Sequence, residues 1–282
     1  MTEVFDPLIS ADEFLALSAD DVAVIDATWF LGERRGRDAY NEAHIPGAHF
    51  FDLDAVVDTS SDLPHMLPSA EVFAEATSPM LDGKSQIVVY DASPLRSAAR
   101  VWWTFRVMGF DNVRVLNGGL DAYVRAGGEV SKAAPSTSDV RKLVNAELVD
   151  HFVVNFNQVS QAFGDEDTLI IDARSAGRFE GREPEPRPGL PSGSMPGSVN
   201  VPFAELYDGD GLMLSREALA KRFEGLPLDR RTPVIASCGS GVTACCVLLA
   251  LTRLGYDQLS VYDGAWAEWG SRSDRIENRS QV

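Results

Sequence analysis

The segment Val24-Ile25-Asp26-Ala27 returns as Ile170-Ile171-Asp172-Ala173, at an offset of 146 positions. Four further segments return in the same order, at offsets between 146 and 150. They are IPGA at 45–48 with MPGS at 195–198, IVVYD at 87–91 with VIASC at 234–238, MGFD at 108–111 with LGYD at 254–257, and GGL at 118–120 with GAW at 264–266. Self-similarity at one spacing is the signature of a duplicated unit. The 282 residues therefore divide into two homologous halves, each of ordinary domain size.

Each half alternates short apolar runs with helical patterns. The runs are rich in β-branched residues and predict buried parallel strands at 22–25, 87–89, 113–116, 169–171, 233–236 and 259–261. Helical patterns lie between them, for example at 97–108 and 243–254. We therefore expect an α/β fold of two tandem domains, each a mainly parallel sheet flanked by helices on both faces.

A small, polar stretch at 131–139, SKAAPSTSD, has the composition of a linker. We expect an N-terminal domain at 1–138, a linker at 139–153 and a C-terminal domain at 154–282.

Charge and composition exclude several classes of partner. Lys+Arg is 25 and Asp+Glu is 42, so the formal net charge is −17, which argues against nucleic acid and anionic membranes as partners. No apolar run approaches the roughly 18 residues of a membrane helix, and residues 1–12 do not resemble a signal peptide. The three cysteines are too few for a disulfide framework and lack metal-site spacing. We expect a cytoplasmic protein without a metal or organic cofactor.

The segment Cys238-Gly239-Ser240-Gly241-Val242-Thr243 joins a predicted buried strand to an apolar helix. Ligands bind at such strand ends in open parallel sheets. The two glycines let the loop curl so that backbone N–H groups point inward, and the helix N-terminus adds partial positive charge. Both effects favour a thiolate, so Cys238 is a candidate nucleophile. The alternative is a small buried residue at a strand end. Thr243 is also expected to cap the helix.

Two other groups of residues are assigned to the core. Cys245 and Cys246 lie inside the apolar helical run, so we expect core residues rather than a resolving thiol. The tryptophans at 102, 103, 266 and 269 are expected to pack in the interior, although one could line a pocket.

The motif CGSGVTA at 238–244 resembles the active-site loop of the sulfurtransferases with two rhodanese domains, in particular the enzymes that use 3-mercaptopyruvate. Further matching segments follow the family's order along nearly the whole chain: AHIPGA at 43–48 with FFD at 50–52, LPHMLP at 63–68, RFEG at 178–181, EPRPG at 185–189, and YDGAW at 262–266 with EWG at 268–270. The resemblance implies a catalytic second domain and an inactive first one. Asp91 stands at the first-half position of Cys238, and a carboxylate cannot carry sulfane sulfur.

The resemblance also implies a reaction and the residues that perform it. Sulfur passes from a donor to Cys238 as a persulfide and then to a nucleophilic acceptor, such as thioredoxin, a small thiol or cyanide. Arg178 and Arg187 are implied to bind a donor carboxylate and carbonyl, with Gly239, Gly241, Val242 and Thr243 providing the loop. The alternative for the arginines is ion pairing with nearby glutamates at 180, 183 and 185.

A proton relay of Ser240, His65 and Asp54 is likewise implied by the resemblance, with Ser240 assisting proton movement rather than acting as a nucleophile. The alternative is that His65 and Asp54 serve only to hold a domain interface.

The choice of donor follows from charge in the loop. Thiosulfate enzymes of the family carry basic residues there, as in CRKGVTA, whereas this chain has the uncharged Gly239 and Ser240. This favours 3-mercaptopyruvate and leaves thiosulfate as the alternative donor. A phosphatase of the Cys-x5-Arg type is disfavoured because Ala244 stands where its arginine is needed. A non-catalytic rhodanese-type binding module remains the second alternative, although such modules usually lack the cysteine.

Overall fold

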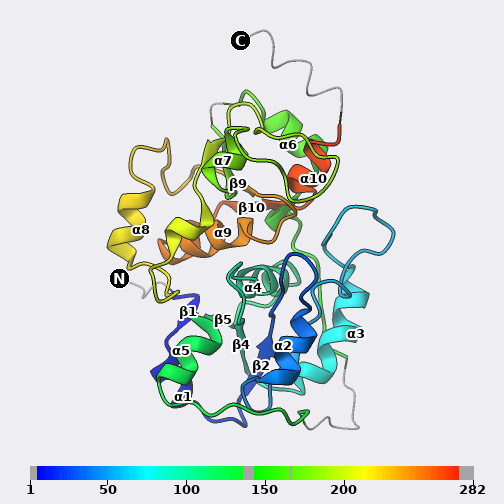
Figure 1. The fold of residues 1–282 in the computed structure, drawn as a ribbon, viewed down its shortest axis with the longest axis vertical. Coiled ribbons are helices and arrows are strands. Elements are labelled where there is room, and N and C mark those ends of the chain that lie inside the picture. Colours follow the sequence, from blue (N-terminus) through cyan, green and yellow to red (C-terminus); the bar gives the residue numbers. More distant parts are fainter. Residues whose placement is uncertain (1–4, 136–142, 166, 273–282) are drawn as a thin grey trace. The chain divides into compact units, whose positions relative to one another are not determined.

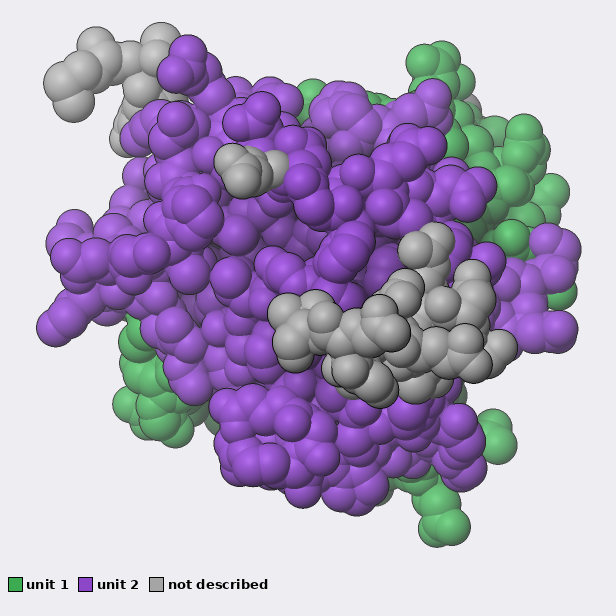
Figure 2. All heavy atoms as spheres, turned by 90° about the horizontal axis from the view of Figure 1, so that it is seen from above, with its two compact units in different colours: residues 1–59, 67–149, 207–215 green, residues 60–66, 150–206, 216–282 purple. Residues whose placement is uncertain are grey.

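The computed structural model describes residues 5–135, 143–165 and 167–272 (Figure 1). The chain forms two compact units, coloured separately in Figure 2. The first comprises Met1–Thr59, Leu67–Val149 and Tyr207–Ser215, and the second comprises Ser60–Met66, Asp150–Leu206 and Arg216–Val282. Each unit thus takes in a short segment from the other half of the chain. The expected boundary at residue 138 and the start of the expected linker, 139–142, lie outside the described residues.

The first unit is built on a five-stranded sheet in which all paired strands are parallel. Its spatial order is β1-β5-β4-β2-β3. The strands are β1 (Leu8–Ile9), β2 (Val22–Asp26), β3 (His49–Phe50), β4 (Gln86–Tyr90) and β5 (Val113–Leu116). The helices are α1 (Ala11–Leu15), α2 (Gly36–Glu42), α3 (Ala70–Leu81), α4 (Ala98–Val107) and α5 (Gly119–Arg125).

Helices cover both faces of this sheet. Successive side chains of a strand point to opposite faces, so Val88 and Tyr90 of β4 share one face. They pack in a cluster with residues of α1, α2 and α5, among them Phe14 and Leu120. The helices α3 and α4 also contact the sheet but contribute nothing to that cluster, so they cover the opposite face.

The second unit repeats this plan, again with all strand pairs parallel, in the order β6-β10-β9-β7-β8. The strands are β6 (Val153–Val154), β7 (Leu169–Asp172), β8 (Val199–Asn200), β9 (Val234–Ser237) and β10 (Leu259–Tyr262). The helices are α6 (Phe156–Ala162), α7 (Ala176–Phe179), α8 (Arg216–Arg222), α9 (Ala244–Arg253) and α10 (Ala265–Trp269), with 3-10 turns η1 (Asp150–Phe152) and η2 (Phe203–Leu206).

The expected α/β fold with two parallel sheets is confirmed. All six predicted strands are present within one or two residues of their expected bounds, and so are the helices at α4 and α9. The two-residue edge strands β1, β3, β6 and β8 were not predicted, because two residues carry no periodicity. The predicted core residues are also confirmed: Cys245 and Cys246 are fully buried, and all four tryptophans are at most 4% exposed.

The carboxylate of Asp91 accepts hydrogen bonds from backbone N–H groups of the loop between β4 and α4. The carboxylate accepts the N–H of Ser93 (3.1 Å) and of Ala98 (2.7 Å), the first residue of α4. Thr28 Oγ1 accepts the N–H of Ala92, at 2.9 Å. Burial raises the pKa of Asp91 to about 6, although the hydrogen bonds from Ala98 and Ser93 act in the opposite direction. The interior of the first-unit loop is therefore occupied by the Asp91 carboxyl group, whose neutral form is favoured by burial.

Replacing Asp91 by Asn should remove a specific pH dependence of stability. Folding raises the pKa of Asp91 from 3.8 to about 6. The stabilisation that the protonated carboxyl group contributes to the folded state is therefore fully present below pH 3.8 and is lost as the pH rises through about 6. Urea unfolding at about pH 5.3 and 7.5 stays above the isoelectric point near 4.6. Over that interval the unfolding free energy of the wild type should fall by about 1 kcal/mol relative to Asp91→Asn. Parallel curves for the two proteins would contradict the assignment.

Candidate active site

Cys238 lies directly after the end of β9, at the entrance to a tight loop that leads into α9. It is a free cysteine and 2% exposed. Its carbonyl accepts the N–H of Trp266 (2.9 Å), and the carbonyl of Gly239 accepts the N–H of Ala267 (3.0 Å). Gly241 has φ +76°, which glycine adopts without strain. The start of α10 therefore fixes the loop from one side through two backbone hydrogen bonds.

This loop has four open backbone N–H groups in the described part of the chain. Among the described residues, no acceptor takes the N–H of Gly239, Ser240, Val242 or Thr243. The expectation that Thr243 caps the helix is wrong in one respect: it occupies the N-cap position, but its side chain makes no capping hydrogen bond. Together with the partial positive charge of the ten-residue α9, these amides favour a negative group beside Cys238.

Ser240 and His65 meet in the second unit. Their Oγ and Nδ1 atoms are 3.2 Å apart, and the side chains belong to residues that are 5% and 9% exposed. His65 has φ +60°, an uncommon conformation for a residue with a side chain, and lies in the 60–66 segment that joins this unit. Asp54 lies in the first unit, where it accepts the indole N–H of Trp29 at 2.9 Å. The structure thus brings Ser240 and His65 of the suggested relay within hydrogen-bond distance of each other.

Arg178 and Arg187 converge on Gly239. A Cβ atom placed on Gly239 would lie 2.9 Å from Arg178 Nη2 and 3.8 Å from Arg187 Nη1. Arg178 also pairs with Glu185, at 2.6 Å between Nη2 and Oε2, so binding and ion pairing are not exclusive alternatives. The Arg178 side chain keeps 23% of its surface exposed, whereas that of Glu185 keeps 2%. Two guanidinium groups are therefore gathered beside Cys238 in a chain of strongly negative net charge.

Arg174 was not predicted from the sequence, but its buried guanidinium connects the residues that hold Arg178. Its side chain is fully buried and donates to Asp172 (2.6 Å), to Glu185 (2.7 Å) and to the carbonyl of Gly193 (2.7 Å). Its guanidinium carbon lies 4.3 Å from the centre of the Trp266 ring. The repeat contained a signal for it. The first-half residue at the same offset from the shared Asp is Thr28, so the arginine is specific to the second half.

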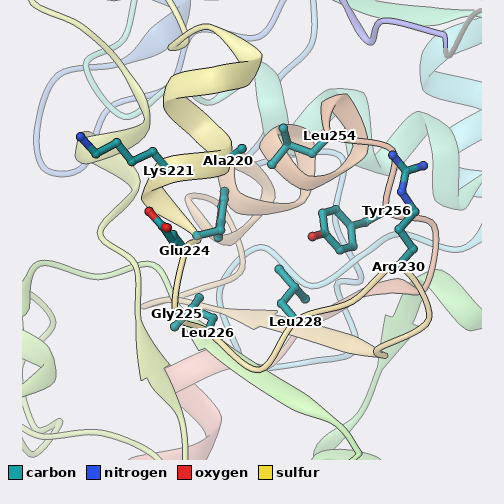
Figure 3. A pocket seen from close by; sticks show the side chains of 10 residues that line it. Ala220, Lys221, Glu224, Gly225, Leu226, Leu228, Arg230, Leu254 and Tyr256 are labelled. Atoms are coloured by element: carbon teal, nitrogen blue, oxygen red, sulfur yellow. The ribbon is translucent and has the colours of Figure 1, made fainter.

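A separate cavity of about 560 Å³ lies in the second unit (Figure 3). It is lined by the end of α8, by six residues between 223 and 230, and by Leu254 and Tyr256. These segments precede β9 and β10, whereas Cys238 follows β9, so the cavity lies at the opposite end of the strands.

Among the described residues, no group of three or more His, Cys, Asp or Glu side chains is placed to hold a metal ion. No helix in the described ranges has the length and apolar character needed to cross a bilayer.

Comparison with known proteins identifies relatives over nearly the whole chain. The family model described as "Rhodanese-like domain" matches twice, at residues 10–126 and 155–272. The 3-mercaptopyruvate sulfurtransferase of Escherichia coli K12 is 40% identical over 268 residues, which cover 93% of this chain and 94% of the relative. Thiosulfate/3-mercaptopyruvate sulfurtransferase 2 of Arabidopsis thaliana is 40% identical, covering 94% and 84%. The crystal structure of SseA from Escherichia coli superposes with a TM-score of 0.81 at 36% identity, covering 93% and 99%.

Replacing Arg174 by Met should destabilise the protein strongly. The change keeps much of the volume but leaves the buried carboxylates of Asp172 and Glu185 without their shared cation, which typically costs about 3–5 kcal/mol. Arg182→Met is the matched control, because the Arg182 side chain forms an exposed ion pair with Glu180 and its replacement should cost less than about 1 kcal/mol. Urea unfolding followed by tryptophan fluorescence measures both. Equal losses in the two variants would mean that the buried chain adds nothing.

Proposed function

The chain belongs to the rhodanese-like family, and from this premise we propose that it transfers sulfane sulfur from 3-mercaptopyruvate through a persulfide on Cys238. The observation that carries the proposal is the set of groups around one loop. A cysteine after a buried strand, four open backbone amides and two arginines lie together there, while the loop itself has no charged side chain. The relatives named for this activity are 38–40% identical to the chain.

The first half-reaction forms the persulfide. The Cys238 thiolate attacks the sulfur of 3-mercaptopyruvate, so that an S–S bond forms and the bond between that sulfur and carbon 3 breaks. The electron pair of the broken bond passes to carbon 3, which gives the enolate of pyruvate. The donor's sulfur loses its thiol proton, and one proton is taken up at carbon 3 to give pyruvate, so that protons balance. The loop amides and the N-terminus of α9 stabilise the terminal sulfur, which carries the negative charge of the persulfide.

The second half-reaction returns the enzyme to its starting form. A thiolate or cyanide attacks the outer sulfur, and Cys238 leaves as a thiolate. The family accordingly uses a small sulfur donor and a nucleophilic acceptor. We propose thioredoxin or small thiols as acceptors, and a reducing, cytoplasmic compartment is compatible with three free cysteines.

Arg178 and Arg187 are proposed to bind the donor. A planar guanidinium donates two parallel hydrogen bonds to a carboxylate, and the second arginine can reach the adjacent ketone. With its carboxylate and ketone held there, the donor's thiol is directed toward Cys238. Thiosulfate carries two negative charges and has no such pair of groups. The uncharged Gly239-Ser240 segment offers no cation to stabilise that second charge, so we keep thiosulfate as the alternative donor.

Ser240 and His65 are proposed to deliver the proton that the enolate needs. The Ser240 hydroxyl lies on the same loop as Cys238, and the imidazole at 3.2 Å can exchange a proton with it. Asp54 is proposed as the third member of this relay.

The first experiment is intact-mass measurement of the reduced protein after brief exposure to 3-mercaptopyruvate or thiosulfate, followed by a cyanide chase. We expect a cyanide-labile gain of one sulfur from 3-mercaptopyruvate and little from thiosulfate. Cys238→Ser should gain none, whereas Cys245→Ser, which changes a buried helical cysteine, should load like the wild type. The reverse donor preference would make this a thiosulfate enzyme. Loading of neither donor would favour a non-catalytic module.

Removing the Ser240–His65 pair should slow the donor half-reaction without abolishing it. We expect Ser240→Ala and His65→Gln each to lower single-turnover pyruvate release by about 10- to 100-fold. The double variant should be no slower than the worse single variant, because the two groups act as one unit. Rapid-quench kinetics across a range of pH measure the effect. Additive losses would indicate that the two residues work separately.

A further inference from the structure

Gly239 is a glycine for reasons of space rather than of backbone conformation. Gly241 needs its φ of +76°, but Gly239 is not among the residues with positive φ. A Cβ at position 239 would instead lie 2.9 Å from Arg178 Nη2, closer than carbon and nitrogen atoms normally approach. The missing side chain therefore leaves the room in which the guanidinium of Arg178 lies.

The Arg178 guanidinium cannot easily move away from such a side chain, because both carboxylate oxygens of Glu185 accept hydrogen bonds from it. Oε1 accepts from Arg178 Nε at 3.1 Å and Oε2 accepts from Nη2 at 2.6 Å. Glu185 is in turn fixed by the buried Arg174, whose Nη1 donates to the same Oε1 at 2.7 Å, and Arg174 is held by Asp172. The chain Asp172–Arg174–Glu185–Arg178 thus runs from the end of β7 to the loop of Cys238.

The charges of this chain cancel. Two carboxylates face two guanidinium groups, and the only member with substantial exposure is Arg178. Arg178 can therefore offer directed hydrogen bonds to a donor, while its positive charge is largely compensated by Glu185. Such a group suits a singly charged carboxylate that accepts two hydrogen bonds, and it gives less to a dianion, whose binding depends more on net charge.

We propose that Glu185 is a positioning residue that holds Arg178 over the Cys238 loop, and that the space at Gly239 together with this compensated charge selects the singly charged donor. The inference rests on the proposed function and extends it to two residues that do not themselves react. Glu185 acts through Arg178, and Gly239 acts by leaving space for it.

The steric part is tested by a double-mutant cycle on the full chain, with kcat and KM measured for 3-mercaptopyruvate. Gly239→Ala should raise KM by about tenfold and leave kcat within about twofold, since the displaced arginine binds rather than reacts. In an Arg178→Ala background the same change should cost nothing further. Gly209→Ala is the matched control, because a Cβ there meets no atom within 4 Å. An equal penalty in both backgrounds would overturn the steric assignment.

The electrostatic part is tested by Glu185→Gln with both donors. The amide keeps the shape but turns an N–H group toward Arg178 and leaves the chain with one extra positive charge. We expect the ratio of kcat/KM for 3-mercaptopyruvate to that for thiosulfate to fall by about tenfold, partly through faster use of thiosulfate. Glu180→Gln makes the same charge change at an exposed ion pair and should leave the ratio unchanged. An unchanged ratio in Glu185→Gln would overturn the positioning role.

Two readouts separate this inference from the proposed function. If the wild type takes no sulfur from 3-mercaptopyruvate, the proposed function fails whatever the variants do. If the wild type loads but the variants keep its parameters, only the inference fails. A crystal structure of Gly239→Ala provides a readout without turnover. In it, Arg178 should be displaced from residue 239, while Glu185 should keep its ion pair with Arg174. An unmoved Arg178 would contradict the inference, as would a Glu185→Gln protein that unfolds while Gly239→Ala behaves as wild type.

Discussion

The N–H groups of a loop that follows a buried parallel strand must find acceptors, and the two halves of this chain meet that requirement differently. In the first unit, Thr28 accepts from Ala92, and the Asp91 carboxylate accepts from Ser93 and Ala98. In the second unit, the corresponding amides have no acceptor among the described residues. A buried amide without a partner is costly unless something binds it. The open amides beside Cys238 are therefore best explained as a site for a negatively charged group.

In a chain with a net charge of −17, a site for an anion requires positive groups that are gathered locally. Its positive groups must be concentrated and aimed, and a free arginine side chain loses much entropy when it is fixed in one place. The second half meets this cost with the ion-pair chain Asp172–Arg174–Glu185–Arg178, in which the side chain of Arg174 is fully buried. Because Glu185 is shared between Arg174 and Arg178, the geometry of the exposed guanidinium depends on a buried one. A change at the buried Arg174 can thus alter the position of the Arg178 guanidinium.

Much of this arrangement could be predicted from sequence, because repetition and strand–loop–helix patterning are local. The repeat predicted the two sheets, and Cys238, which follows an apolar strand and precedes Gly239, predicted the position of the candidate site. The exchange of segments 60–66 and 207–215 between the units was not predictable, since it depends on contacts between residues distant in sequence. Arg174 was missed for a related reason: an arginine two residues after a strand reads as exposed, and only its partners Asp172 and Glu185 make its burial tolerable.

The first unit also shows how much of a site must change together. Exchanging Asp91 for Cys would place a thiol at the equivalent strand end, but the loop amides would not all become available. Thr28 would still occupy the amide of Ala92, and the loop would still reach its helix at Ala98, one residue later than the second-unit loop reaches Ala244. Thr28 stands at the position of Arg174, so the buried cation that holds Glu185 in the second unit has no counterpart there. A nucleophile is therefore the smallest part of the difference between the units. The larger part is the removal of internal acceptors and the construction of a buried ion-pair chain, and both concern residues that never touch the sulfur.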